Sequence, residues 1–237
     1  MNSNRKSYSW QRVNCSYEKG LYMRIERVES LDKRKCKVFT DEDFAFLLYN
    51  GELEKYGVCE GAVLEERTER ELLDLLSRRA HERALNLLKV QDRTEGEMCR
   101  RLFQDGYPDS IVQETIGFLQ EYHFVDDARY AANYLQVHGK RKSQAELKLY
   151  LQRKGISREI IREQLEETEH DSGEAIRVLL EKKHYRAGET APEEEKKIIA
   201  YLMRRGFSWE DIRGGKKGEG GGLYWLLSAE AFSKNKF

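Results

Sequence analysis

The fold is decided by residues 147–165, LKLYLQRKGISREIIREQL, which predict a helix, a glycine stop and a second helix. Leu147 and Leu151 are four residues apart and share one helical face. Gly155 can enter the left-handed conformation that ends a helix at a cost about 1 kcal/mol lower than a residue with a Cβ. Ser157 can then cap the next helix.

The same pattern occurs twice more, around Gly106 and Gly206, and the three glycines are 49 and 51 residues apart. Each copy has apolar residues eight and four positions before the glycine, one after it and six after it. They are Met98, Leu102, Tyr107 and Val112, then Leu147, Leu151, Ile156 and Ile161, then Ile198, Leu202, Phe207 and Ile212. A self-similar period near 50 residues predicts a tandem repeat.

A further apolar helical pattern precedes each copy, which predicts three helices per repeat and about nine in the array. Capping boxes predict where four of these helices begin. They are Thr68 with Glu71, Thr94 with Glu97, Ser143 with Glu146, and Thr190 with Glu193. Because one repeat buries too little apolar surface to be robust alone, neighbouring repeats should stack.

The front of the chain has the alternating pattern of short strands. Residues 21–28 (LYMRIERV), 36–39 (CKVF) and 44–48 (FAFLL) predict three strands, followed by a short helix over 52–56 that stops at Gly57. The chain therefore divides into a small β-rich domain, three helical repeats and a glycine-rich atypical tail. The predicted segments are 1–67, 68–122, 123–169, 170–213 and 214–237.

The bulk composition limits the class of protein. Lys and Arg number 42, as do Asp and Glu, so a zero net charge gives no strong overall attraction to nucleic acid. No apolar run is long enough to cross a bilayer, and no apolar signal-peptide core opens the chain. The four cysteines are scattered without a C-x-x-C pair, which predicts a reduced, cytoplasmic protein.

No pattern predicts catalysis, a metal or a cofactor. The five histidines lack ligand spacing, so surface or helix-end positions are favoured over a metal site. Asp126 and Asp127 are better explained as a helix cap and a favourable charge at a helix N-terminus than as acid–base groups. GGKKGEGGG at 214–222 lacks the residue order of a phosphate-binding loop. It interrupts the last helix of the third repeat, which should be the least stable.

Cations recur near the same place in each repeat. Helix C-terminal charge and a solvated face explain about half of them; the functional alternative is a basic stripe that faces phosphates or an acidic protein groove. The candidate partner-binding residues are Lys140, Arg141, Lys142, Arg153, Lys154, Arg158, Arg162, Arg204 and Arg205. Glutamates at 159, 163, 166 and 167 weaken a purely DNA-binding interpretation.

Three runs together resemble the RecX family of recombination regulators: ALNLLKVQDRTEGEMCRRLFQDGY, IVQETIGFLQEYHFVDDARYA and ELKLYLQRKGISREIIREQL. The resemblance covers about residues 68–213 and is most specific in VDDARYA and the repeated L-x-x-x-G spacing. It implies three tandem three-helix repeats, distantly like helix-turn-helix units, in an elongated curved molecule. It also implies a non-enzymatic protein that lodges in the groove of the RecA filament on single-stranded DNA. Members of the family modulate recombination, usually by inhibiting RecA ATP hydrolysis, strand exchange and coprotease activity. The glycine-rich tail departs from the family pattern.

Two functions follow as expectations. The first is a monomeric regulator of the RecA filament in DNA repair and recombination, with only weak binding of its own to single- or double-stranded DNA. The alternative is a direct DNA-binding regulator that uses the helix-turn-helix-like repeats. The zero net charge argues against a strong form of the alternative.

Overall fold

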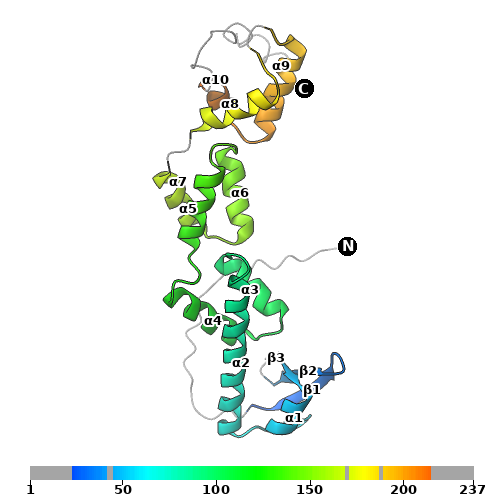
Figure 1. Ribbon diagram of the computed structural model, residues 1–237. Helices are drawn as coiled ribbons and strands as arrows, with labels where there is room; N and C mark the ends of the chain where they lie inside the picture. Colours follow the sequence, from blue (N-terminus) through cyan, green and yellow to red (C-terminus); the bar gives the residue numbers. More distant parts are fainter. Residues whose placement is uncertain (1–22, 42–44, 169–170, 187–188, 215–237) are drawn as a thin grey trace. The chain divides into compact units, whose positions relative to one another are not determined.

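The computed structural model describes residues 23–41, 45–168, 171–186 and 189–214, and it forms two compact units, Met1–Asp74 and Leu75–Phe237 (Figure 1). The described residues are mainly helical, with ten helices and one small sheet near the front of the chain. The fold class predicted from the sequence is therefore confirmed. Leu21, where the first strand was expected to begin, and the glycine-rich tail from 215 lie outside the described residues.

The sheet of the first unit is antiparallel in the order β1–β2–β3, with strands Ile25–Ser30, Lys35–Thr40 and Ala45–Tyr49. In β2, Cys36, Val38 and Thr40 are buried on alternate positions, as one covered face requires. A bulge between Ile25 and Arg27 shifts the register of β1, so its apolar residues do not alternate strictly. The three predicted strands are confirmed.

Helix α1, Asn50–Tyr56, follows β3 directly and ends at Gly57, which has a φ of 63°. The predicted short helix and its glycine stop are therefore confirmed. Val58 and Leu64 are buried in the same unit, and the backbone N–H of Leu64 donates to the carbonyl of Met23 over 2.9 Å. This segment returns the chain to the start of β1.

Helix α2 runs over Glu66–Leu88 and begins earlier than the sequence predicted. Thr68 lies inside the helix, so the capping box of Thr68 with Glu71 is wrong. Glu71 instead pairs with Arg67 across one helical turn, with Nε and Oε1 3.1 Å apart. The acidic residues Glu66 and Glu69 occupy the first turn, where the helix dipole favours negative charge.

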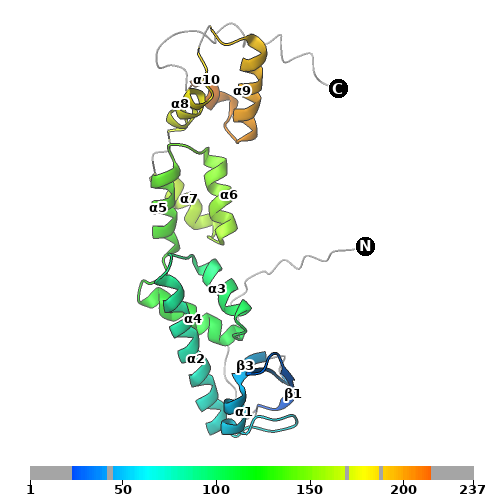
Figure 2. The same cartoon turned by 45° about the vertical axis from the view of Figure 1, so that its right-hand side comes forward.

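The second unit contains three groups of three helices (Figures 1 and 2). The first group is the end of α2 with α3 (Glu95–Gln104) and α4 (Asp109–Glu121). The second is α5 (Asp127–His138), α6 (Gln144–Lys154) and α7 (Arg158–Glu167). The third is α8 (Ser172–Lys182), α9 (Pro192–Arg204) and α10 (Trp209–Gly214). The domain boundaries predicted from the sequence stay predictions.

Each group has its own apolar core, built from the residues of the repeat pattern. Leu102 and Val112 are buried in the first core, Leu151 and Ile161 in the second, and Leu202 in the third. Ile198, the first apolar position of the third copy, is only partly buried and packs at the edge of its core. The repeat spacing thus identifies the core of all three groups.

Positive φ angles mark the helix ends. Gly106, Gly155 and Gly206 have φ of 85°, 97° and 83°, as predicted for glycines that stop the second helix of each repeat. Two further stops use histidine instead of glycine: His123 after α4 and His184 after α8, with φ of 55° and 53°. No glycine signals these two positions in the sequence, so their conformation was not predicted.

Two of the four predicted capping boxes are confirmed, and the other two, at Thr68 and at Thr190, are wrong. Thr94 with Glu97 caps α3, and Ser143 with Glu146 caps α6. At α9 the N-cap is Ala191 and Pro192 is the first helical residue. Proline fixes φ at a helical value and has no N–H to satisfy, so it sets the helix start there. The Thr190 hydroxyl instead bonds to the backbone of Arg186.

None of the described helices is long and apolar enough to cross a membrane. Helix α10 is described as far as Gly214, and the interruption that the sequence predicted after it lies outside the described residues.

Candidate functional site

Several polar contacts of the second unit join one repeat to the next. The N-terminus of α3 in the first repeat meets the C-terminal end of α6 in the second. Thr94 Oγ1 accepts from the N–H of Glu97 over 3.2 Å and donates to the carbonyl of Lys154 over 2.6 Å. Lys154 Nζ lies 2.6 Å from Glu97 Oε1. We call this contact the first joint.

The backbones of α3 and of the end of α6 are in close contact at the first joint. Gly96 lies against Gly155 so tightly that a Cβ on Gly96 would be 2.9 Å from the Gly155 Cα and 3.2 Å from the Lys154 carbonyl oxygen. Only glycine fits at Gly96 without movement of backbone. The joint therefore combines a helix cap, an ion pair and a glycine–glycine contact.

The second joint repeats this arrangement between α6 and α9. Ser143 Oγ accepts from the N–H of Glu146 over 3.1 Å and donates to the carbonyl of Arg205. Arg205 binds Glu146 with two nitrogens, Nε to Oε1 and Nη2 to Oε2, each over 2.8 Å. A Cβ on Gly206 would be 2.7 Å from the Cβ of Ala145, which stands where Gly96 stands in the first joint. Bidentate pairs of this kind are strong and geometrically specific.

Two of the nine candidate partner-binding cations, Lys154 and Arg205, therefore lie in the joints. Their side chains are only 20% and 23% exposed. The hydrogen bond to Glu97 raises the pKa of Lys154, and the hydrogen bond to Glu146 raises the pKa of Arg205, so both stay charged. Their charges are therefore paired with glutamates of this protein.

The other candidate cations differ in how strongly they are engaged. Lys140 is 72% exposed and 3.5 Å from Glu174, and Arg162 lies 3.8 Å from Glu166; exposed pairs at such distances are weak. Four are exposed, with side chains that form no ion pair or hydrogen bond to another described residue. These four are Arg141, Arg153, Arg158 and Arg204.

Lys142 has a different environment, which the sequence analysis did not predict. The rings of Tyr134 and Tyr150 are stacked with centroids 4.0 Å apart and planes 4° apart. Lys142 Nζ lies 5.0 Å and 5.3 Å from these two centroids and donates to the Tyr134 hydroxyl. We call Tyr134 and Tyr150 the tyrosine stack. The stack joins the basic loop at 140–142 to α5 and α6.

The helix α5 places further aromatic groups on the same face. Tyr130, Tyr134 and His138 are four residues apart, a spacing that could have been found in the sequence. Burial, followed by a hydrogen bond with Tyr150, raises the pKa of Tyr130 to about 12. Burial, followed by the nearby Lys142 and Arg141 charges, lowers the pKa of His138, so this imidazole is kept neutral.

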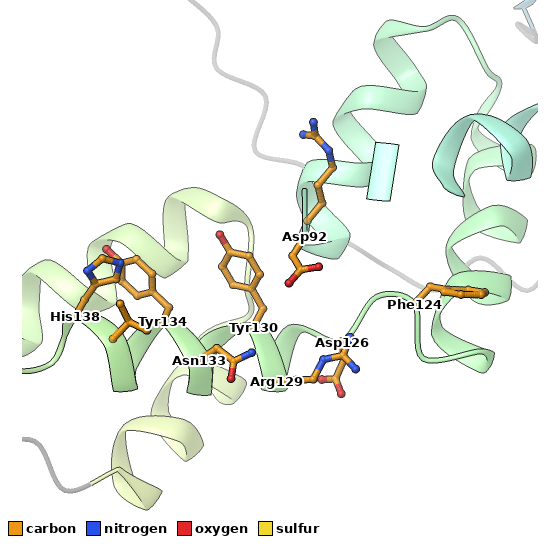
Figure 3. Close-up of a pocket in the computed structure, with 10 residues that line it drawn as sticks. Asp92, Phe124, Asp126, Arg129, Tyr130, Asn133, Tyr134 and His138 are labelled. Carbon is orange, nitrogen blue, oxygen red and sulfur yellow. The ribbon is translucent and has the colours of Figure 1, made fainter. Parts of the chain in front are cut away.

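A pocket of about 200 Å³ lies beside this face (Figure 3). Figure 3 shows His138 at one end of the pocket, Phe124 at the other, and Tyr130 near Asp92. The lining comes from the loop before α3, the α4–α5 connection and α5 itself. It consists of Asp92, Arg93, Phe124, Asp126, Arg129, Tyr130, Asn133, Tyr134, Val137 and His138.

The acidic pair at 126–127 is structural, as expected. Asp126 is the N-cap of α5 and accepts from the N–H of Arg129 over 2.9 Å. Asp127 Oδ1 accepts from the N–H of Glu95 over 2.9 Å and so supplies a second cap to α3. Among the residues that the structure describes, no group of His, Cys, Asp and Glu could hold a metal ion.

This pair gives a pH-dependent prediction. Burial raises the pKa of Asp127 and of Glu95, and each carboxylate is also close to other negative charge. The folded protein therefore binds a proton at these two carboxyl groups more tightly than the unfolded chain does. Their contribution to the free energy of unfolding is present at low pH and is lost as the pH rises through the raised pKa values. Asp127→Asn keeps the acceptor oxygen but cannot ionise. We expect the wild-type protein to lose stability relative to this variant as the pH rises above about 4, the ordinary pKa of an aspartate, measured by urea unfolding.

The control for this prediction is Asp109→Asn, which removes an exposed carboxylate from the first turn of α4. Like Asp127→Asn, this variant removes a negative charge from the first turn of a helix, but Asp109 is not part of the buried pair of Asp127 and Glu95. If the unfolding free energies of wild type and Asp127→Asn change in parallel with pH, Asp127 does not make the proposed contribution.

Three comparisons with known proteins agree with this architecture. Family models described as the first, second and third three-helix domains of RecX match residues 80–119, 126–165 and 171–214. Two relatives are each named "Regulatory protein RecX". One, from Clostridium tetani, is 31% identical over 55% of this chain and 62% of its own length. The other, from Clostridium acetobutylicum, is 27% identical over 79% of this chain and 92% of its own length.

Solved structures give the same fold. One titled "Crystal structure of regulatory protein RecX" aligns with a TM-score of 0.53 at 23% identity, over 81% of this chain and 99% of its own. A second, RecX from Lactobacillus salivarius, aligns with a TM-score of 0.50 at 21% identity, over 59% of this chain and 94% of its own. The three family matches cover the three helical groups in order, each with its own core. This chain belongs to the RecX family of regulatory proteins.

Proposed function

We propose that this protein is a non-enzymatic cytoplasmic regulator that binds the RecA filament on single-stranded DNA and inhibits its ATPase, strand-exchange and coprotease activities. Membership of the RecX family supports the regulatory role. The observation that carries the proposal is the pair of joints, which recur with the same chemistry at Lys154 and Arg205. They hold successive repeats in a defined register, as a ligand that spans a regular filament requires.

The contacts with the filament are assigned to cations outside the joints. Arg141, Arg153 and Arg158 belong to the middle repeat and are exposed, and Arg204 continues the series in the third. Individual exposed charges contribute little, but contacts made at once by several repeats add through a high effective concentration. Inhibition of this kind does not require a net positive molecule.

The test is RecA ATP hydrolysis on single-stranded DNA with this protein titrated in. We expect inhibition at well below one molecule of this protein per RecA molecule, because one bound regulator affects several protomers. Absence of inhibition together with tight, steeply salt-dependent binding to naked DNA would instead support the direct DNA-binding alternative. Absence of both effects would contradict the proposal.

A further inference from the structure

The small sheet of the first unit has one face that points away from the core. In β2, Cys36, Val38 and Thr40 are buried, so the alternate residues of this strand lie on the opposite face. The cross-strand pairs extend this face to both neighbouring strands. It consists of Arg27 and Glu29 from β1, Lys35, Lys37 and Phe39 from β2, and Ala45, Leu47 and Tyr49 from β3. We call it the outer sheet face, and all of its residues are partly or fully exposed.

Cations of the outer sheet face lie over its aromatic rings. Arg27 Cζ is 4.3 Å and Lys37 Nζ is 4.7 Å from the ring centroid of Phe39. Lys35 Nζ is 5.4 Å from the ring centroid of Tyr49, its direct cross-strand partner. Cation–π contacts of this kind hold long, flexible side chains close to the sheet. Two rings therefore place three positive charges on one surface.

One carboxylate offsets this charge only in part. Glu29 Oε1 lies 3.0 Å from Arg27 Nη1, and both side chains are about half exposed, so the pair is weak. Three cations and one carboxylate leave the outer sheet face with a net charge of +2, although the whole chain has a net charge of zero. The face is therefore a local basic patch that attracts a negatively charged partner.

The two rings differ in what they can contact. Phe39 is approached by two cations, so its ring serves to place them. Tyr49 lies at the end of β3 and is 43% exposed, so a partner can reach its ring. An exposed ring next to cations is the usual platform on which an unpaired base stacks, and the guanidinium plane of an arginine can be stacked on in the same way.

This combination selects the class of partner. An acidic peptide would use the cations but not the exposed ring. Duplex DNA offers phosphates, but its bases stack on one another and their faces cannot reach a tyrosine. An anionic membrane requires a continuous apolar surface, whereas each ring of this face lies next to a charge. Unpaired nucleotides use both features, since their phosphates meet the cations and their bases meet the ring.

We propose that the outer sheet face binds single-stranded nucleic acid without sequence preference, with a base stacked on Tyr49 and phosphates bound by Arg27, Lys35 and Lys37. Every base has a face that can stack, so this contact does not select a sequence. The inference goes beyond the proposed function, which rests on cations of the second unit and gives the first unit no role. Its test does not require RecA.

The first experiment measures binding of a fluorescent oligothymidylate of about 15 nucleotides to the full-length protein, between about 50 and 200 mM salt. We expect Tyr49→Ala to bind about tenfold more weakly than wild type with the same salt dependence, and Tyr49→Phe to bind within about twofold of wild type. The backbone N–H of Tyr49 donates to Glu52 Oε2 over 2.9 Å, and this contact survives both changes. Equal affinities of wild type and Tyr49→Ala, or equal losses in the two variants, would overturn the proposal.

A double variant, Lys35→Gln with Lys37→Gln, tests the phosphate contacts separately. Each phosphate contact on a single strand contributes about 0.7 to the slope of log K against log salt, so the slope should become shallower by about 1.4. The matched control is Lys89→Gln with Lys182→Gln, the same change at two exposed lysines outside the first unit. We expect this control to keep the wild-type slope. An unchanged slope in the first double variant, or equal changes in both, would contradict the assignment of phosphates to the outer sheet face.

Competitors test the class of partner. Unlabelled duplex DNA, polyglutamate and vesicles that contain phosphatidylserine should each displace the oligothymidylate at least about tenfold less effectively than an unlabelled single strand. Any of the three that competes as well as the single strand would overturn the proposal. Oligothymidylate and oligouridylate share the proposed chemistry, and the stronger competitor of the two shows whether the face prefers DNA or RNA.

The RecA ATPase titration separates this inference from the proposed function. If wild type inhibits RecA but the variants of the outer sheet face bind oligothymidylate as wild type does, this inference is wrong and the regulatory proposal stands. If those variants lose binding as expected but wild type does not inhibit RecA, this inference stands and the regulatory proposal is wrong.

Discussion

Reversal of three exposed cations of the middle repeat, Arg141→Glu, Arg153→Glu and Arg158→Glu, is expected to raise the concentration needed for RecA inhibition by more than about tenfold. Each change replaces an attraction by a repulsion at the partner surface. The three side chains are exposed and form no ion pair with another described residue, so helicity and unfolding temperature should change little. Circular dichroism and the ATPase titration measure the two effects separately.

A matched control keeps the change in net charge and moves it away from the middle repeat. Lys33, Arg34 and Lys89 are also exposed, and their reversal to Glu should leave inhibition within about twofold of wild type. Equal loss of inhibition in both triple variants would mean that long-range charge, and not the middle repeat, drives binding. Normal inhibition by the middle-repeat variant would remove the basis of the cation assignment.

The joint cations should behave in the opposite way. Lys154→Glu replaces the ammonium that lies 2.6 Å from Glu97 Oε1 by a carboxylate, at a place where both side chains are mostly buried. Breaking such a pair leaves a poorly solvated charge and is expected to lower the free energy of unfolding by roughly 2–4 kcal/mol. Loss of function in this variant would therefore report a weakened joint, not a lost contact with the filament.

The sequence predicted the helical repeats well because their signals are local. An apolar ladder, a cation pair and a glycine within about nine residues determine a helix and its end, and Gly106, Gly155 and Gly206 all have the predicted positive φ. The failures are also local. Pro192 sets the start of α9 after the cap predicted at Thr190, and α2 begins at Glu66, before the cap predicted at Thr68.

The joints could not be predicted in the same way, although their capping residues, their cations and the glycines that stop the helices were predicted to have local roles. The capping box accounts for Glu97 and the negative end of a helix accounts for Lys154, so neither residue signals a distant partner in the sequence. In the structure each residue keeps its local role, and the two also pair with each other across 57 positions of the chain. A residue with a sufficient local explanation gives no sign of a long-range contact, and this is why Lys154 and Arg205 were grouped with the exposed cations.

The pocket was missed for a different reason. Its aromatic residues come from α5, at four-residue spacing, and this spacing is also that of an ordinary core face. Asp92 and Arg93 belong to a loop whose position relative to α5 depends on how the first repeat meets the second. Only the three-dimensional structure brings this loop and Tyr130 to one cavity.

The glycine contact of the first joint predicts that the same substitution, glycine to alanine, changes the stability of the protein in opposite directions at two positions. Gly96 and Gly117 are both helical glycines of the second unit. A Cβ on Gly117 would meet nothing within 4 Å, whereas a Cβ on Gly96 would lie 2.9 Å from the Gly155 Cα. Alanine favours a helix over glycine by about 1 kcal/mol, so Gly117→Ala should stabilise the protein by about 0.5–1 kcal/mol.

Gly96→Ala should instead destabilise the protein by about 1–3 kcal/mol, because the atoms in its way are backbone and cannot rotate aside. Hydrogen exchange locates the cause: the N–H of Glu97, which donates to Thr94 Oγ1 in the first joint, should lose protection in Gly96→Ala and keep it in Gly117→Ala. If register between repeats is needed for action on a filament, Gly96→Ala should also weaken RecA inhibition although it alters no exposed charge. Stabilisation by both alanines would show that the first joint yields easily, and the register of the exposed cations would then need another origin.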